Sequence, residues 1–231
     1  MPPRAGAQLA LALPGDAIAY TVRRSSRARR VSVKVELSTG VEVVLPQRAP
    51  ERAAAVAVRE LRPWIERRLA ERERLRDQLA RRTGVLPYLG EELQLVPQPG
   101  RRLVRRDGQR LLVPAGAPQP ALESFYRNAA RREIAARLDA ATASVGARYS
   151  GLSIRAQRTR WASCSAGGGM SFNWRLMMAP ERVLDYVVWH EVCHLEIRDH
   201  SPRFWALLEQ RWPSWREQRS WLRRHGQTLV L

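Results

Sequence analysis

The segment that says most about the fold and function of this protein is His190-Glu191-Val192-Cys193-His194, followed closely by His200. These positions hold three of the four histidines in the chain. Residues i and i+4 lie on one face of a helix, so His190 and His194 can direct ring nitrogens at the same ion. The segment therefore predicts a metal site on a helix. Apolar residues at helical spacing before it indicate that this helix packs against a core.

Zinc is the ion that this pattern favours. It accepts imidazole nitrogens, and its catalytic sites combine three protein ligands with one open position. Glu191 follows His190 directly but is not a ligand in this pattern. We expect it to act as the general base toward a metal-activated water. The sequence thus predicts Zn2+ as the cofactor and hydrolysis as the reaction.

His200 is the expected third ligand, provided that the helix ends before it. A helix continuing six residues past His194 would carry His200 about 240° round and about 9 Å along the axis, out of reach of the ion. Ser201-Pro202 predicts a new helix start, because serine is a favoured N-cap and proline a favoured first helical residue. His200 would then lie in the bend between two helices. Glu209 and Glu217 are the alternative third ligands.

The composition describes a strongly basic chain of 231 residues with a formal net charge of +18. Lys34 is the single lysine among 40 basic residues, a bias that we attribute chiefly to a GC-rich genome. The net charge itself favours weak association with nucleic acid. The two cysteines, Cys164 and Cys193, give no disulfide framework and fit a reduced, cytoplasmic location. We expect no signal peptide in the apolar run 5–13 and no membrane span of about 20 residues.

Two domains are expected, joined at the proline-rich segment 114–120: a β-rich N-terminal domain over residues 1–115 and a metal-binding domain over residues 116–231. The first should contain a long helix and two groups of strands, of which the first group forms a small antiparallel sheet. The expected ranges are 50–82 for the helix, broken near Pro63, 18–24, 30–37 and 41–45 for the first strands, and 86–96, 101–106 and 109–113 for the second, with a hairpin at Asp107-Gly108.

The second domain should combine helices with a short antiparallel sheet. Helices are expected at 122–145, 181–197, 202–211 and 213–224, and strands at 152–156, 159–164 and 170–174. The last strand precedes the metal-site helix, and we expect it to be an edge that pairs with an extended peptide. The expected substrate-binding residues are accordingly Met170, Ser171, Phe172 and Asn173. Candidates for stabilising an oxyanion are Tyr149, Arg160, Tyr186 and His225.

Several blocks around the predicted metal site resemble the YgjP-like metallopeptidase family, whose members are zincins related to SprT-like and Wss-like proteases. They are Arg160-Trp161-Ala162-Ser163-Cys164-Ser165, Phe172-Asn173, Pro180, Tyr186-Val187-Val188, His190 to Leu195, His200-Ser201 and Phe204-Trp205. In the first half, an arginine-rich loop between strands, Val44-Leu45-Pro46, Trp64-Ile65 and Tyr88-Leu89-Gly90 also resemble it, so the resemblance covers nearly the whole chain. Ala162 stands where the family pattern has glycine.

This resemblance implies a minimal zincin-like catalytic domain in which His190, His194 and His200 hold zinc and Glu191 is the catalytic residue. We therefore expect an α+β protein that hydrolyses peptide bonds in a peptide or protein substrate. Two other functions remain open, a zinc-dependent nucleotide (phosphoanhydride) hydrolase and a metal-stabilised nucleic-acid-binding module. Release of phosphate would identify the first, and a closed site with four protein ligands would identify the second.

Overall fold

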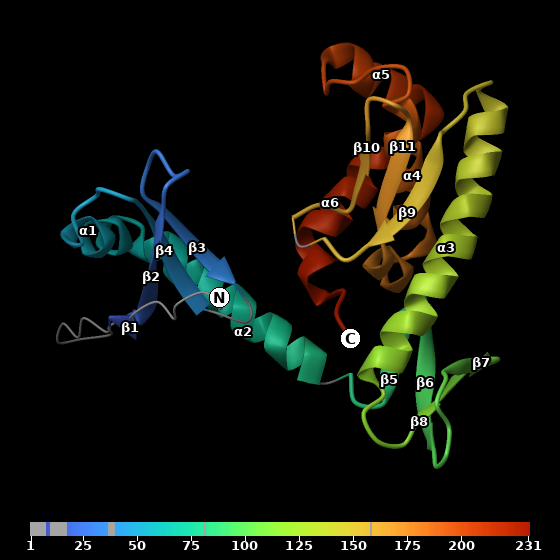
Figure 1. Ribbon diagram of the computed structural model, residues 1–231, viewed down its shortest axis with the longest axis horizontal. Coiled ribbons are helices and arrows are strands. Elements are labelled where there is room, and N and C mark those ends of the chain that lie inside the picture. Colours follow the sequence, from blue (N-terminus) through green and yellow to red (C-terminus); the bar gives the residue numbers. More distant parts are fainter. Residues whose placement is uncertain (1–7, 10–17, 37–39, 81, 158) are drawn as a thin grey trace. The chain divides into compact units, whose positions relative to one another are not determined.

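The computed structural model describes residues 8–9, 18–36, 40–80, 82–157 and 159–231 (Figure 1). The chain divides into two compact units, Met1–Arg81 and Arg82–Leu231. Each unit has its own hydrophobic core. Among the described residues, no helix combines the length and the apolarity that crossing a membrane requires.

The first unit is a four-stranded sheet with two helices. Its strands are β1 (Gln8–Leu9), β2 (Tyr20–Ser25), β3 (Ser32–Glu36) and β4 (Gly40–Pro46), and its helices are α1 (Arg52–Glu60) and α2 (Arg62–Ala80). The predicted break in the long helix is confirmed, because α1 ends at Glu60 and Pro63 lies in the first turn of α2, where its missing N–H costs no helical hydrogen bond. The core lies between Val43 and Leu45 of β4 and Ile65 of α2, all fully buried.

The sheet of the first unit is mixed, so the prediction of an antiparallel sheet is wrong. Its order is β1-β2-β4-β3, in which β2 and β4 are parallel while the outer pairs are antiparallel. The alternation of apolar and polar residues identifies a strand, but it does not identify the direction of its neighbour.

The second unit begins with a sheet that repeats this arrangement. Its strands are β5 (Val85–Tyr88), β6 (Glu91–Gln98), β7 (Arg105–Asp107) and β8 (Arg110–Pro114), in the order β5-β6-β8-β7 with β6 and β8 parallel. The predicted hairpin at Asp107-Gly108 is confirmed by the pairing of β7 with β8. The other hairpin turns at Leu89 and Gly90, both with positive φ, and the Leu89 N–H donates to the Met177 carbonyl at 2.8 Å.

This sheet belongs to the same compact unit as the predicted metal-binding domain. The long helix α3 (Gln119–Ser144) follows β8, and its Tyr126 is fully buried and donates a hydrogen bond to the Pro87 carbonyl at 2.7 Å. Leu111 and Val113 share one core cluster with Tyr126 and Trp174. The chain therefore divides between residues 81 and 82, whereas the sequence placed the boundary between 115 and 116. The proline-rich segment connects two parts of the chain that share one hydrophobic core.

A third sheet and three more helices complete the second unit. The strands are β9 (Gly151–Arg155), β10 (Ala162–Cys164) and β11 (Gly169–Asn173), followed by the short 3-10 helix η1 (Trp174–Met178), the helices α4 (Glu181–Cys193), α5 (Pro202–Arg211) and α6 (Trp215–His225), and the 3-10 helix η2 (Gly226–Thr228). Helix α3 runs along the sheet and contacts α4 and β9 (Figure 1). The sheet is again mixed, with order β10-β11-β9 and a parallel pair β9–β11, so the antiparallel prediction fails here too.

An ion-pair network joins α3 to α4. The Arg137 guanidinium of α3 binds Asp185 at 2.8 Å and Glu181 at 2.5 Å in α4, and Glu133 at 2.6 Å in its own helix. Burial raises the pKa of Asp185, although the Arg137 charge and hydrogen bond oppose this. The network holds the helix that carries the histidines against α3.

Candidate metal centre

The helix that carries the HExxH segment ends before His200, as the predicted role of His200 as third ligand requires. Helix α4 stops at Cys193, and the N–H groups of His194, Leu195 and Glu196 donate to carbonyls three residues earlier, which tightens the chain into turns. The helix is thus shorter than the predicted range 181–197. Ser201 occupies the N-cap position of α5 as expected, although its side chain makes no capping hydrogen bond.

The three histidines converge in this bend. One nitrogen from each of His190, His194 and His200 lies within 4.8 Å of the other two. The Nε2 atoms of His190 and His200 are 3.0 Å apart. These three residues can hold a metal ion, and they are the set that the sequence predicted.

Their chemical state suits a metal ligand. His194 Nδ1 lies 2.9 Å from the Ile197 carbonyl oxygen, which accepts only from a protonated Nδ1, and in the neutral tautomer with that proton Nε2 carries the lone pair. Burial, with the nearby His194 and His200, lowers the pKa of His190 to about 3. Burial, together with His194, also lowers the pKa of His200. His190 and His200 therefore carry neutral rings at neutral pH, as metal binding requires.

Two aromatic residues of α5 hold the three rings in place. Phe204 is fully buried and stacks on His194 with ring centroids 4.5 Å apart. Its ring also contacts His190 at 4.9 Å and His200 at 4.8 Å. Trp205 stacks on the outer side of His200 at 5.5 Å. In the sequence, both residues belong to a block that resembles the family, but no contact with the histidines was predicted for them. Their contact with the ligands depends on the angle between α4 and α5, which no local pattern gives.

Glu191 follows His190 directly on α4, and its side chain lies in the protein interior. Its side chain is 4% exposed, and its Oε2 atom has no hydrogen-bond partner among the described residues. Burial raises the pKa of Glu191 to about 8, opposed by a hydrogen bond from the Cys164 backbone N–H and by the charge of Arg160. A nearby cation would favour the ionised carboxylate. The Cys164 contact was not foreseen, although the block 160–165 had stood out as one that resembles the family.

The strand expected to bind substrate is not an edge. β11 lies between β10 and β9 and pairs with both, and the side chains of Met170, Phe172 and Asn173 are buried. The Asn173 side-chain amide also donates to the Gln157 carbonyl at 2.7 Å. Met170, Ser171, Phe172 and Asn173 therefore cannot offer a free backbone edge. The outer strand beside Glu191 is β10.

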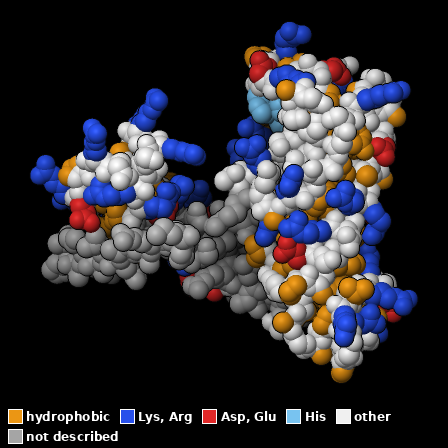
Figure 2. Space-filling view, in the orientation of Figure 1, with side chains coloured by type: hydrophobic (Ala, Val, Ile, Leu, Met, Phe, Trp, Pro, Cys, Tyr) orange, Lys and Arg blue, Asp and Glu red, His pale blue; other side chains and the backbone are white. Residues whose placement is uncertain are grey.

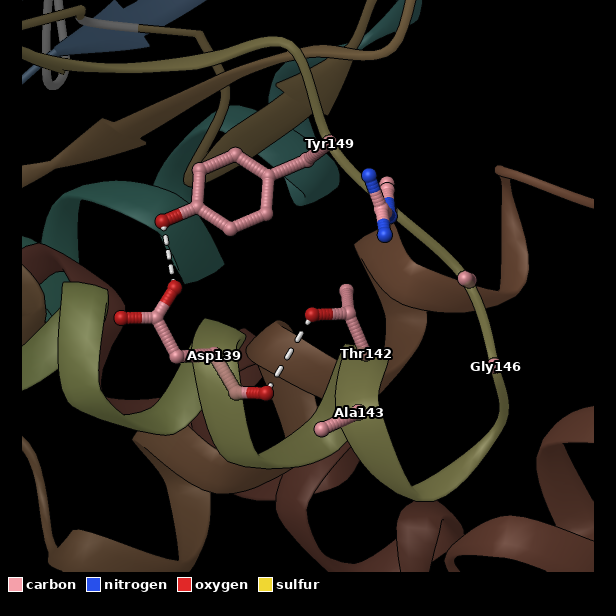
Figure 3. A pocket seen from close by; sticks show the side chains of 7 residues that line it. Asp139, Thr142, Ala143, Gly146 and Tyr149 are labelled. Carbon is pink, nitrogen blue, oxygen red and sulfur yellow. Dashed lines mark hydrogen bonds between the residues drawn. The ribbon is translucent and has the colours of Figure 1, made fainter.

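The remaining candidates lie in different surroundings. Tyr149 lines a pocket beside the end of α3, and its hydroxyl donates to Asp139 at 2.8 Å (Figure 3). No histidine lines that pocket. Tyr186 lies one helical turn before His190 with ring centroids 6.0 Å apart, and burial raises its pKa to about 12.

The alternative third ligands are placed elsewhere. Glu209 accepts hydrogen bonds from the Trp215 indole and from Arg216. Glu217 lies in the first turn of α6 and is exposed. Neither belongs to the group of side chains that can hold a metal. Of the other oxyanion candidates, Arg160 acts electrostatically on Glu191, whereas His225 packs on Trp221 with ring centroids 5.0 Å apart.

Comparison with known proteins gives a family and two partial structural similarities. The crystal structure of the metallopeptidase zymogen abylysin from Pyrococcus abyssi is 22% identical, covers 38% of this chain and 90% of its own, and has a TM-score of 0.36. The zymogen of jannalysin from Methanocaldococcus jannaschii is also 22% identical, covers 33% of this chain and 79% of its own, and has a TM-score of 0.31. None of the curated proteins matches the chain. The YgjP-like metallopeptidase domain matches residues 29–225, which is most of the sequence, and the chain therefore belongs to the YgjP-like metallopeptidase family.

Proposed function

We propose that this protein is a zinc-dependent metallopeptidase that uses Glu191 as its general base. The observation that carries the proposal is the convergence of His190, His194 and His200 next to a buried carboxylate. Membership of a metallopeptidase family supports the reaction class.

The donor set fits zinc. Nitrogen ligands at about 2.0 to 2.1 Å in a tetrahedron lie about 3.4 Å apart, and the three histidine nitrogens are already within 4.8 Å of one another. A zinc ion held there would polarise a carbonyl group and make water a better nucleophile near neutral pH. Three ligands from the chain leave room for a substrate or a water, as a catalytic site requires.

Glu191 would handle the proton. The Cys164 N–H donates a hydrogen bond to its carboxylate, while Oε2 is buried and has no partner in the described part of the chain. Oε2 would accept a proton from the attacking water and then deliver it to the nitrogen of the leaving amine. Burial raises the pKa of Glu191, the Cys164 N–H and the Arg160 charge lower it, and a bound cation would favour the ionised form that accepts a proton.

An extended peptide could align along β10. The Trp161 carbonyl accepts from Asn173 and the Ser165 N–H donates to Gly169, so odd-numbered residues of this segment bond to β11. In an antiparallel pair the alternate residues point the other way, which directs the backbone groups of Ala162 and Cys164 away from β11. The Cys164 N–H is engaged by Glu191, and the other groups form an edge close to the reacting carboxylate.

The test uses zinc-loaded protein and an unstructured protein such as casein as substrate. Glu191→Gln keeps the shape of the side chain and all three histidines but cannot accept a proton. Zinc content should therefore be unchanged while kcat falls by about 10² to 10⁴-fold. His200→Ala should lose most of the zinc, whereas Glu209→Gln should retain it.

Three outcomes would contradict the proposed function. Wild-type turnover that survives in Glu191→Gln would exclude the proposed general base. Full zinc content in His200→Ala would exclude His200 as a ligand. Release of phosphate from nucleoside triphosphates by a zinc-loaded protein that cleaves no polypeptide would replace the peptidase proposal with a nucleotide hydrolase.

A further inference from the structure

A stack of side chains leads from the metal-binding histidines to an arginine at the surface. Trp205 stacks on His200, and Trp215 stacks on Trp205 with ring centroids 4.6 Å apart. The Arg219 guanidinium lies over both indoles, 4.8 Å from the Trp205 ring and 5.7 Å from the Trp215 ring. Figure 2 shows histidine side chains reaching the surface of this unit with arginine side chains beside them.

Arg219 and Arg216, which lie on the same helix, differ in their ion-pair partners. Arg216 also lies over the Trp215 ring, at 4.7 Å, but it forms a salt bridge with Glu209. Arg219 makes no salt bridge or side-chain hydrogen bond within the part of the chain that the structure describes, and its side chain is exposed. A cation–π contact holds a guanidinium near the rings without using its N–H donors. Arg219 is thus a cation held beside two indoles, with no carboxylate partner among the described residues.

Arg219 is also close enough to act on the site electrostatically. After burial and the neighbouring histidines, its charge is a further cause of the lowered pKa of His190 and His200. Arg160 acts on Glu191 instead, so positive charges lie near both the ligands and the general base. The opposing carboxylate is Asp199, which is fully exposed and accepts a hydrogen bond from the Ser201 N–H. Two arginines and one aspartate therefore act on His190, His200 and Glu191.

We propose that Arg219 binds an acidic side chain of the substrate and gives the enzyme a preference for peptides with Asp or Glu near the cleaved bond. This inference rests on the proposed peptidase function. A planar guanidinium matches a carboxylate through two parallel N–H bonds, and a residue already held by two indoles loses little freedom on binding. A carboxylate from the substrate would give Arg219 an ion-pair partner, as Glu209 does for Arg216.

The test measures binding in the Glu191→Gln background, so that turnover is not needed. The probes are fluorescent peptides of glutamine and alanine in which a single Glu replaces Gln at each position in turn. Zinc-loaded protein should bind one or two of these peptides on the order of 10-fold more tightly than the all-Gln peptide, which corresponds to about 1.4 kcal/mol. Arg219→Gln should abolish this preference and Arg219→Glu should reverse it. Arg219→Lys should retain part of it.

Arg216→Ala is the matched control, because it removes a cation from the same helix and from the same indole. It should leave the preference intact, with zinc content and thermal unfolding recorded for every variant. The inference is overturned if the parent shows no preference for Glu, if Arg219→Gln retains it, or if Arg216→Ala loses it equally. Cleavage of the peptides without any dependence on Arg219 would refute this inference alone. An Arg219-dependent preference without cleavage by zinc-loaded wild type would refute the peptidase function alone.

Discussion

Replacing Phe204 with leucine should weaken zinc binding more than it weakens the fold. Phe204 is fully buried and is the one described residue whose ring contacts all three histidines, with centroids between 4.5 and 4.9 Å away. Leucine fills much of the same space but offers no flat face to the imidazoles. The ligands would then lose the packing that holds their orientation.

The size of the effect follows from these contacts. A packed aromatic pair contributes about 0.5 to 1.5 kcal/mol beyond its buried area, and three contacts to one ring are not additive. A loss of about 1.4 kcal/mol from the metal-bound state corresponds to about 10-fold weaker binding. The metal-free fold should lose only about 1 to 2 kcal/mol, because a similar volume remains buried.

Leu208→Ala provides the control. Leu208 is fully buried one turn later on α5, and truncating it should cost about 2 to 5 kcal/mol of stability. Zinc affinity would be measured by competition with a chromophoric chelator, and metal-free stability by urea unfolding. Phe204→Leu should be the more stable variant and the weaker zinc binder. Equal zinc affinity in Phe204→Leu and wild type, or an equal loss in Leu208→Ala, would refute the orienting role of the ring.

Three further perturbations test other parts of the structure. Arg137→Ala should destabilise the protein by about 2 kcal/mol in urea unfolding, more than an exposed pair contributes, because it leaves the half-buried Asp185 without its partner. A loss below about 0.5 kcal/mol would contradict this. Gly226→Ala should cost about 1 to 3 kcal/mol, since its new Cβ would lie 2.7 Å from Trp161 Cζ2, whereas Gly167→Ala, with nothing within 4 Å, should be tolerated. Any binding of duplex DNA should weaken steeply between about 50 and about 200 mM salt, and a shallow slope in a filter-binding or anisotropy titration would show that the net charge does not drive it.

The sequence predicted the group of three histidines better than the sheets around it. Helical spacing brought His190 and His194 together, and Ser201-Pro202 correctly required a helix break before His200. Both signals are local, so they can be read from a single segment. They also favoured His200 over Glu209, which the structure places in a contact with Trp215.

Strand pairing was predicted less well because it is not local. Each of the three sheets contains a parallel pair, and alternation of side chains looks the same in either direction. The same limit made β11 look like an edge, since nothing within 170–174 shows that β9 returns to its far side. Pro114 to Pro120 resembled a linker because proline content reports on the local backbone. The shared core of Leu111 and Tyr126 depends on contacts across that segment.

The sheet β5-β6-β8-β7 has a consequence for how this part of the chain can fold. Its antiparallel pairs, β5 with β6 and β7 with β8, each connect through a tight turn at Leu89-Gly90 or Gly108. Parallel pairing usually forms late, because distant segments must meet before they gain any contacts. Here two hairpins can each form in about 1 to 10 μs and then dock along β6 and β8, between which only the segment with β7 intervenes. A growing chain could therefore complete this sheet before the helix that bears the histidines has been synthesised.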